Sequence, residues 1–519
     1  MSHRKRLVLL LVIAVLLFCA LALLHNSAPS DRPDSSSSQD TSLTEAESYL
    51  PSGLMLGEKL PYTKFSTLEG GLIDLNNEKG APLVLLFWSG FCPHCKEQLA
   101  LWEDAAHILD AYGARLLLLA RTGGDRETLS SAALYAEENA VPWPILYDEN
   151  RTAYDAWGVR RIPTTVIVDG DGVIRAIRAE KLSAAELEAL LQDALLGRSV
   201  ATEAFLLRTM REDGGIPTIF LERSAAKAAV ISESQGLAME CALLSGNRTM
   251  FDQAYSFVNA NLRLDSGLYA WRFTAEGDAA TANALLDDLR IYHALTRANA
   301  LWGGYEDDAK ALHKALLEQL VQKGSLVDFY DAKSDTASTQ LSLHYADFEA
   351  IRLLDPSLSA RMLSLVEGGY ISDQFPLYFR TYDYRKKRYL DDDLHTAEAL
   401  YTVWHLAQAG KVRTETIIWL HTELARGGPM ALYRTNGTVP SGYTYTSSAV
   451  YALVGLIADE IGDTVLLSHA LQLLDQIRIT DADSSDYGAF GEHSGSFHAF
   501  DQALPLLLYR MLEQDADIE

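Results

Sequence analysis

The chain has few cysteines and few positive charges for its length. Its 519 residues include four cysteines, and 44 lysines and arginines stand against 70 aspartates and glutamates, a formal net charge of -26. So few cysteines do not make a disulfide-rich scaffold. Phosphate binding needs clustered lysine and arginine, which this sequence does not display, so we expect no nucleic-acid partner. The chain is too long for one ordinary core, and we expect two or more folded domains.

One long apolar run stands at the N-terminus, from residue 7 to residue 24, directly after three basic residues. Its 18 residues are at the short end of a membrane span, and the basic flank favours the cytoplasmic side. No small-residue cleavage site follows, and the phenylalanine before Cys19 spoils a lipoprotein motif, so we favour an uncleaved anchor in residues 1–25 over a signal peptide. This predicts a single-pass protein of a bacterial cell membrane, with its domains on the extracytoplasmic side.

Short apolar runs alternate with amphipathic segments after a polar linker. Residues 26–50 are too rich in serine and aspartate to bury a core, and we expect a disordered linker there. In residues 51–198 the pattern is typical of buried strands at 82–88 and 114–120, a hairpin at 164–177 and a closing helix at 183–195. This order predicts an α/β domain.

Two cysteines follow the first of these strands in the segment FWSGFCPHCKEQ. Cys92 falls where the strand ends and a helix begins, so unpaired amides and the helix dipole stabilise its thiolate, and we expect it to be a nucleophile. Cys95 lies one turn further on the same face and can close a short disulfide as the resolving partner. A zinc site needs two more ligands and no second paired-cysteine motif exists, so we expect no metal. The alternative is a small structural disulfide.

This domain resembles the thioredoxin superfamily, specifically its membrane-anchored TlpA/ResA-like branch. The resemblance covers about residues 54–197 and rests on FWSGFCPHCKEQ followed by VPWPILYDENRTAYDAWGVRRIPTTVIVDGDGVI. It implies thiol-disulfide exchange with a protein partner and a cis peptide bond before Pro163, beside the cysteines. Pro93 and His94 resemble the residues of strongly oxidising disulfide donors, in which the histidine stabilises the thiolate. The direction of electron flow stays open.

Helical periodicity replaces strands in residues 200–519. Six helical hairpins of about 50 residues each predict a closed all-α (α/α)6 toroid, joined by glycine- and aromatic-rich loops. In the segment ISESQGLAME we expect Ser232 to be an N-cap and Gln235 to complete a capping box. Glu233 is then in the first turn, where a carboxylate complements the helix dipole and needs no function. The twelve predicted helices span residues 203–212, 233–246, 249–262, 279–299, 306–323, 338–354, 357–368, 394–410, 413–426, 446–462, 464–477 and 498–512.

The same segment resembles glycoside hydrolase family 8, whose (α/α)6 barrel has its active site in a cleft at the helix ends. Ser232, Glu233, Gly236 and Met239 match the family's Ser-Glu-x-x-Gly-x-x-Met segment position by position. In that family the segment carries the general acid. The resemblance therefore implies that Glu233 is the acid of a glycosidase.

The resemblance continues through LDSGLYAWRF and LLDDLRIYHALTRA. It implies that Trp271 stacks on a sugar, and that Asp287 or Asp288 holds the sugar at the cleavage point. Tyr345 is one of several further aromatic residues near helix ends whose rings suit sugar faces, with a buried core position as the alternative.

A second carboxyl is needed, because inverting glycosidases, the class of this family, use an ionised carboxylate to activate water. The family's Asp-Ala-Ile-Arg helix aligns best with a segment that begins at Glu398. Glutamate is one methylene longer than aspartate, so either the pocket compensates or another carboxylate serves. The alternatives are Asp347 and residues 391–393. A lost base would leave a sugar-binding relic.

Together these features predict a membrane-tethered, extracytoplasmic protein without a cofactor. Its thioredoxin-like domain would exchange thiols and disulfides, and its helical domain would be an endo-acting hydrolase of a β-linked polysaccharide. One alternative is an oxidoreductase whose helical domain only binds a glycan or a client protein. The other, a scaffold with two degenerate domains, is disfavoured because Cys92, Cys95 and Pro163 are intact.

Overall fold

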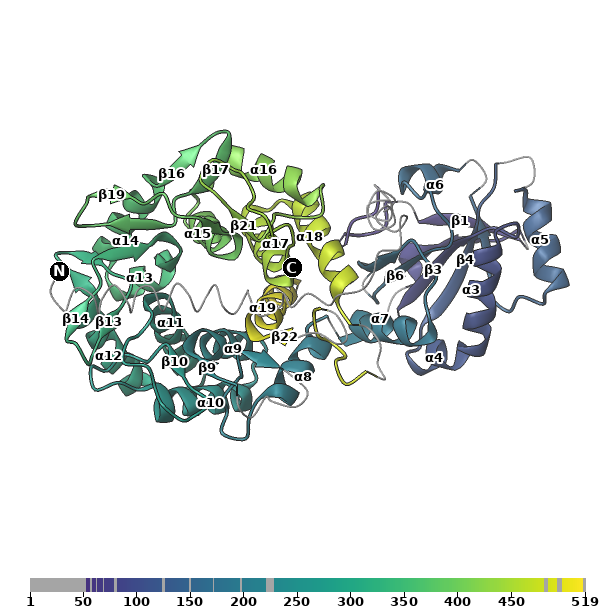
Figure 1. The fold of residues 1–519 in the computed structure, drawn as a ribbon. Helices are drawn as coiled ribbons and strands as arrows, with labels where there is room; N and C mark the ends of the chain where they lie inside the picture. The colour runs from purple at the N-terminus through teal and green to yellow at the C-terminus, as the bar shows by residue number, and fades with distance from the viewer. Residues whose placement is uncertain are drawn as a thin grey trace, which may run out of the picture. The chain divides into compact units, whose positions relative to one another are not determined.

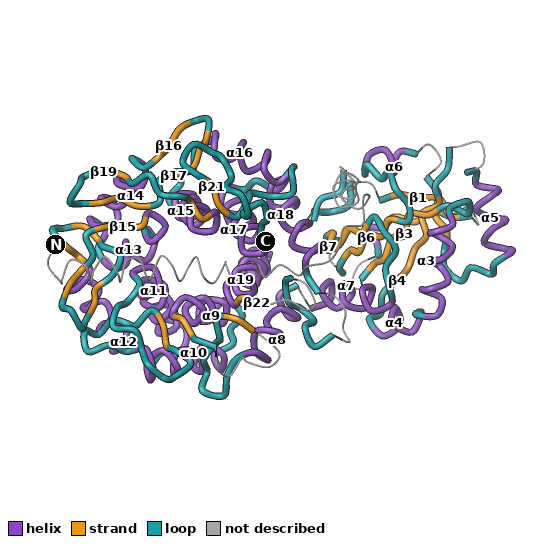
Figure 2. The backbone as a smooth tube through the Cα atoms, in the orientation of Figure 1, coloured by secondary structure: helices purple, strands orange, loops and turns teal. Residues whose placement is uncertain are grey.

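The computed structural model describes residues 53–516, except 57, 62, 69, 79–81, 124–126, 149–150, 171, 197, 221–227, 480–483 and 492–496. The predicted anchor and linker, residues 1–50, lie outside the described residues. Within the described ranges, no helix is both long enough and apolar enough to pass through a bilayer. The described residues build an α/β part followed by an all-helical part (Figures 1 and 2).

A seven-stranded sheet forms the α/β part, in the order β2-β1-β5-β4-β3-β6-β7. Strands β3, β4 and β5 are parallel, and the other pairings are antiparallel. The predicted strands and hairpin are confirmed to within about a residue at each end. The strands are β1 (Lys64–Thr67), β2 (Leu72–Asp74), β3 (Leu83–Trp88), β4 (Arg115–Ala120), β5 (Ile145–Tyr147), β6 (Thr164–Val168) and β7 (Ile174–Arg178).

The central strand β3 is buried on both faces. Its Phe87 packs edge-on against the rings of Tyr154 and Trp157, with centroids 5.0 and 5.2 Å away. Trp88 points to the opposite face and joins the core formed with α3, α4, α5 and α7. Successive side chains of a strand alternate between faces, so an unbroken apolar run suits a strand that is covered on both sides. The helices are α3 (Pro93–Asp104), α4 (Ala106–Ala111), α5 (Leu129–Glu138), α6 (Thr152–Ala156) and α7 (Ala184–Leu196).

The helical part is a closed ring. Helices α9, α11, α13, α15, α17 and α19 each pack against the next, and α19 packs back against α9. Helices α10, α12, α14, α18 and α8 pack outside α9, α11, α13, α17 and α19 respectively, and α16 packs against α18. This arrangement confirms the predicted (α/α)6 class, and Figure 1 shows the ring of inner helices. The helices are α8 (Ser199–Thr209), α9 (Ser232–Leu244), α10 (Arg248–Phe257), α11 (Leu285–Trp302), α12 (Glu306–Ala315), α13 (Phe348–Leu354), α14 (Pro356–Glu367), α15 (Thr396–Gln408), α16 (Thr414–Leu424), α17 (Ser448–Ile461), α18 (Thr464–Ile477) and α19 (Ala499–Ala516).

The prediction that strands disappear from the helical part is wrong. Two-residue strands lead into three inner helices, and each pairs with a strand from a neighbouring loop. Residues 338–347, predicted as helix, include a strand and a 3-10 turn before α13. Pairings this short fix the entry into a helix but are too brief to leave a sequence period. The three pairs are β9 (Val230–Ile231) with β10 (Arg272–Phe273), β20 (Leu394–His395) with β21 (Leu432–Tyr433), and β22 (Phe497–His498) with β8 (Ile219–Phe220).

Buried ion pairs connect β7, α7 and the start of α8 with α18. The Asp475 carboxylate on α18 lies 3.4 Å from the Arg198 guanidinium and 3.7 Å from that of Arg178. Nearby, Arg478 pairs with Asp193 of α7. Burial raises the pKa of Asp475, but the arginines outweigh burial, and the net pKa lies below the usual value. The aspartate is therefore ionised and compensated inside the protein.

Candidate active sites

Cys92 is the N-cap residue of α3. Its Sγ accepts a hydrogen bond from the backbone N–H of Cys95 at 3.2 Å, and its thiol donates to the Ile162 carbonyl at 3.6 Å. Both cysteines are free thiols, Cys92 partly exposed and Cys95 buried. The peptide bond between Ile162 and Pro163 is cis, as predicted. The structure therefore brings the predicted exchange residues together at the end of β3.

The two thiols differ in accessibility. Burial raises the pKa of Cys95 well above its usual range, and its hydrogen bond with Cys92 adds to the shift. Cys95 therefore stays protonated at neutral pH, and Cys92 is the thiol that a partner can reach. His94 is exposed, and its ring lies 3.6 Å from Glu97, which itself pairs with Lys181 at 2.6 Å.

Carboxyl groups gather at one end of the helical ring. Glu233, Asp287, Glu398 and Asp501 each lie in the first turn of their own inner helix, α9, α11, α15 and α19. The positive end of a helix dipole stabilises a carboxylate at this position. The charges of the other three groups all act on the carboxyl of Glu233, which places the four carboxyls in one neighbourhood. The ring therefore forms one acidic site.

Glu233 is half-buried within this site. Burial raises its pKa to about 8, the charges of Asp287, Glu398 and Asp501 add to this, and Arg290 opposes it. Glu233 is therefore protonated at neutral pH. A carboxyl that keeps its proton at neutral pH is what a general acid requires.

Ser232 does not act as the predicted N-cap. The N-cap is Ile231, and the Ser232 hydroxyl instead donates to the Asp287 carboxylate. The backbone N–H of Ser232 donates to the Trp271 carbonyl at 3.1 Å. The predicted capping box is also wrong, because the Gln235 side chain bonds three backbone groups in other segments. Contacts between segments have replaced the local cap.

Gly236 makes room for a buried arginine. A Cβ at this position would lie 3.0 Å from Cδ of Arg290. Arg290 comes from α11, lies 3.5 Å from the Glu240 carboxylate and 3.6 Å from that of Asp287, and donates to the Tyr401 hydroxyl at 3.2 Å. The glycine of the matched segment thus leaves room for the Arg290 side chain to pack against α9 and contact Asp287 in the acidic site.

The neighbouring residues Asp287 and Asp288 have different partners in the structure. The Asp288 carboxylate is fully buried and accepts hydrogen bonds from the backbone of Tyr269 at 3.1 Å and from the Asn283 amide at 2.8 Å. It therefore holds a loop in place. Asp287 instead contacts Ser232 and Arg290 at the acidic site.

The two predicted sugar-stacking residues lie beside these carboxyls. Trp271 is half-buried, and its carbonyl holds the backbone of Ser232. The Tyr345 ring packs edge-on against His344, with centroids 4.6 Å apart. Burial raises the pKa of Tyr345, and the charge of Asp287 contributes, which places its hydroxyl near the acidic site.

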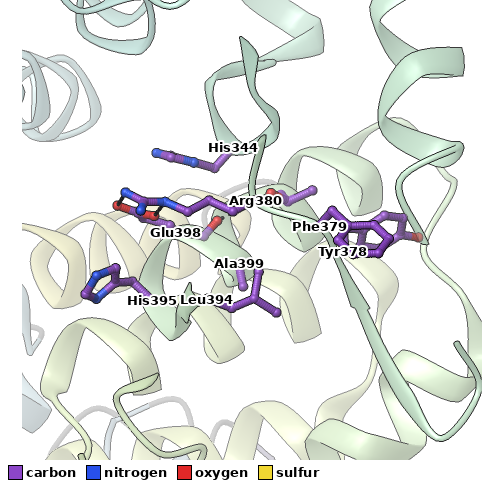
Figure 3. Close-up of a pocket in the computed structure, with 9 residues that line it drawn as sticks. His344, Tyr378, Phe379, Arg380, Leu394, His395, Glu398 and Ala399 are labelled. Atoms are coloured by element: carbon purple, nitrogen blue, oxygen red, sulfur yellow. Dashed lines mark hydrogen bonds and ion pairs between the residues drawn. The ribbon is translucent and has the colours of Figure 1, made fainter. Parts of the chain in front are cut away.

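An arginine holds Glu398 as an ionised carboxylate. Arg380 Nε lies 2.6 Å from Oε2 of Glu398, and Nη2 donates to Oε1 at 3.0 Å. Figure 3 shows this pair with the tips of His344 and His395 pointing to the same side of the pocket. Burial raises the pKa of Glu398, but His344, Arg380 and His395 outweigh it and lower the pKa below its usual value. Its protonation state is therefore opposite to that of Glu233.

The other carboxyls considered as a base have different surroundings. Residues 391–393 are exposed, and Asp391 accepts a hydrogen bond from Thr435. Asp347 caps α13, accepting from the Ala350 backbone N–H at 3.0 Å. Across the part of the chain that the structure describes, no group of His, Cys, Asp and Glu side chains is arranged to hold a metal.

Comparisons with known proteins match both parts. Residues 56–177 match the model of the AhpC/TSA family, and residues 181–327 match that of the glycosyl hydrolases family 8. The chain joins a thioredoxin-like domain to a family 8 domain. A solved structure described as a novel alpha-amylase from Clostridium perfringens is 27% identical, with a TM-score of 0.55 over 60% of this chain and 97% of that one.

Two curated relatives match stretches of different length. The protein YdaJ of Bacillus subtilis (strain 168) is 27% identical over 321 residues, 60% of this chain and 86% of YdaJ. The thiol-disulfide oxidoreductase ResA of Halalkalibacterium halodurans is 25% identical over 118 residues, 23% of this chain and 65% of that protein. The thioredoxin-like domain is accordingly a disulfide oxidoreductase domain.

Several residues of the acidic site were not found from the sequence. Arg290 had a signal, because it follows Asp287 by three positions and so lies on the same helical face. Arg380 had none, because it lies between the short strands β17 (Phe375–Tyr378) and β18 (Thr381–Asp383). Asp501 had no sequence signal either, because it comes near the other carboxyls only when the last helix, α19, packs against α9 and closes the ring.

Proposed function

We propose that the protein is an inverting glycoside hydrolase joined to a thiol-disulfide exchange domain. Glu233 donates a proton to the leaving oxygen, and Glu398 accepts a proton from the attacking water. The observation that carries this proposal is the opposite protonation of the two carboxyls, one with a pKa raised to about 8 and the other with a pKa lowered. An inverting mechanism needs one protonated and one ionised carboxyl.

The remaining residues have supporting roles in this proposal. Asp287, held by Ser232 and Arg290, binds the sugar at the cleavage point. Trp271 and Tyr345 stack on sugar rings. Arg380 keeps Glu398 ionised and oriented, and the site needs no cofactor.

The proposed substrate is a β-linked polysaccharide that is cleaved internally. An α-linked glucan is the second candidate, because a structure with 27% identity is described as an alpha-amylase. A panel of mixed-linkage glucan, carboxymethyl cellulose, chitosan and amylose separates the two candidates.

The test measures release of reducing ends by the full chain on this panel. Glu233→Gln should lower the rate by about 10²- to 10⁴-fold, because the amide cannot donate the proton. Glu306→Gln is the matched control, since Glu306 is an exposed glutamate in the first turn of the outer helix α12. A Glu233→Gln variant as active as the parent would remove the acid assignment.

For the thioredoxin-like domain we propose exchange through Cys92. Its thiolate attacks a partner disulfide, and Cys95 then attacks the resulting mixed disulfide. Reduction of insulin by the full chain should be lost in Cys92→Ala. An unchanged rate in that variant would end the proposal.

The helical domain has an alternative role as a glycan-binding domain. If the parent hydrolyses nothing on the panel and Glu233→Gln leaves polysaccharide binding intact, the helical domain only binds glycans.

We also propose that residues 1–25 tether both domains to the extracytoplasmic face of a bacterial membrane. The support is the apolar run after three basic residues. Fractionation should place the full chain with membranes and a chain lacking residues 1–25 in the soluble fraction. Equal distribution of the two would contradict the tether.

A further inference from the structure

A hollow lined by arginines opens in the thioredoxin-like domain. Its volume is about 370 Å³, within the range of pockets that take a small ligand or a few side chains. The lining consists of Arg121, Arg151, Tyr154, Asp155, Gly158, Val159 and Arg160. Three positive side chains thus face one negative side chain, although the whole chain has a net charge of -26. The hollow therefore differs in charge from the rest of the protein.

The hollow lies beside the exchange centre. Arg121 directly follows β4, and its backbone N–H donates to the carbonyl of Trp88 at 2.8 Å, at the end of the strand that leads to Cys92. Arg160 stands two residues before Ile162, whose carbonyl accepts the Cys92 thiol. The segment after β4 and the segment before Ile162 therefore both lie near Cys92 and line the hollow.

The arginines are only weakly compensated. Arg121 lies 3.2 Å from Glu127, and Arg151 lies 3.5 Å from Asp155, whose side chain is 70% exposed. Arg160 is exposed and forms no ion pair with any residue in the described ranges. All three arginines keep contact with solvent, and partly exposed pairs of this kind are screened by water, so the guanidinium groups remain able to bind another anion.

We propose that this hollow docks an acidic segment of the polypeptide whose disulfide or thiol meets Cys92. Guanidinium groups bind carboxylates through paired hydrogen bonds, and complementary charge speeds encounter while disfavouring basic partners. The proposal rests on the exchange function and adds selectivity for partners with glutamate or aspartate near the reacting cysteine.

The docked segment presents its disulfide to Cys92. The Cys92 thiolate attacks one partner sulfur, forms a mixed disulfide and releases the other partner sulfur as a thiolate. The Cys95 thiol then attacks the Cys92 sulfur, and its proton leaves with the first partner sulfur, which is released as a thiol. The partner leaves with two thiols, and the two cysteines of the protein are left as a disulfide.

The test uses the full chain and two labelled peptides that carry serine in place of cysteine. One has a run of glutamates beside the serine, and the other has glutamines. We expect the acidic peptide to bind about fivefold more tightly or better at low salt, and to lose this advantage in about 0.5 M sodium chloride. Arg121→Gln and Arg160→Gln should each weaken its binding about three- to tenfold.

Arg115→Gln is the matched control, because Arg115 begins β4 and Arg121 follows the other end of the same strand. Equal binding of both peptides, or an equal loss in Arg115→Gln, would overturn the proposal. Stoichiometric binding of inorganic phosphate that displaces the peptide would also overturn it, in favour of a small-anion site. Selective binding without exchange of the cysteine-bearing acidic peptide would leave the docking site standing and reject the exchange function instead.

Discussion

At the residue scale, two glutamates in equivalent places have opposite pKa shifts. Both lie in the first turn of an inner helix, so the helix dipole alone does not distinguish them. Glu233 is surrounded by other carboxyls, whereas Glu398 is held by Arg380 and flanked by two histidines. The neighbours therefore decide which group gives a proton and which takes one.

The rate of polysaccharide hydrolysis should depend on pH with two limbs. The rate falls as pH rises through about 8, because Glu233 loses the proton that it must donate. The rate also falls at acid pH, below the usual pKa of a glutamate, as Glu398 becomes protonated. Initial rates across pH measure both limbs. A rate that is still rising above about pH 8 would contradict the assignment of Glu233.

Arg380→Met should move the acid limb to higher pH. Removing the guanidinium removes one of the groups that lower the pKa of Glu398, so this pKa rises and the ionised form is lost sooner on acidification. The alkaline limb should stay close to its place. Arg388→Met is the control, since Arg388 is exposed on β19 (Arg388–Tyr389). An acid limb that does not move would show that another group sets it.

At the element scale, the inner helices bring distant residues together by close packing. Helix α9 packs against α10, α11 and α19, and Gly236 on α9 leaves the space that Arg290 of α11 fills. From this position Arg290 contacts Glu240, Asp287 and Tyr401. The glycine is therefore required by helix packing and not by a turn.

Gly236→Ala should lower kcat by about tenfold or more while the protein stays folded, because the new Cβ displaces Arg290 from Asp287. Gly455→Ala is the contrast, since a Cβ there would lie 2.5 Å from Leu508, within the contact of α17 and α19 and not against Arg290. That variant should lose thermal stability but keep its kcat per folded molecule. Circular dichroism measures the thermal stability of each variant, and hydrolysis rates give its kcat. Equal changes of both quantities in the two variants would refute the packing role of Gly236.

At the scale of the whole molecule, the two domains share buried charges. Asp475 of the helical part pairs with Arg178 and Arg198, which come from β7 and the start of α8. A buried carboxylate with two cationic partners is costly to remove, because the arginines stay buried without compensation. These pairs join the described residues of the two domains into one compact unit.

Asp475→Asn should destabilise the folded chain by about 3–5 kcal/mol, because it leaves two arginines without their shared carboxylate. Differential scanning calorimetry of the full chain should show a lower Tm. Asp307→Asn, an exposed aspartate on α12, is the control and should change Tm little. If the two variants melt alike, the buried pairs do not hold the unit together.

Apolar periods and resemblance marked the twelve helices and four strands of the sheet, β3, β4, β6 and β7, but not the short strands β1, β2 and β5. What the sequence did not show depends on contacts between distant segments. Gln235 bonds backbone groups elsewhere and does not complete a cap, and Arg380 reaches Glu398 from a short loop. The choice between Asp287 and Asp288 likewise needed coordinates, because both occupy one helical turn.

The most direct test of the central claim is the anomeric configuration of the first product, followed by proton NMR during hydrolysis. If Glu233 and Glu398 act as acid and base with water between them, the new reducing end has the configuration opposite to that of the bond cleaved. A product that retains the configuration, or no product from any polysaccharide of the panel, would contradict the account.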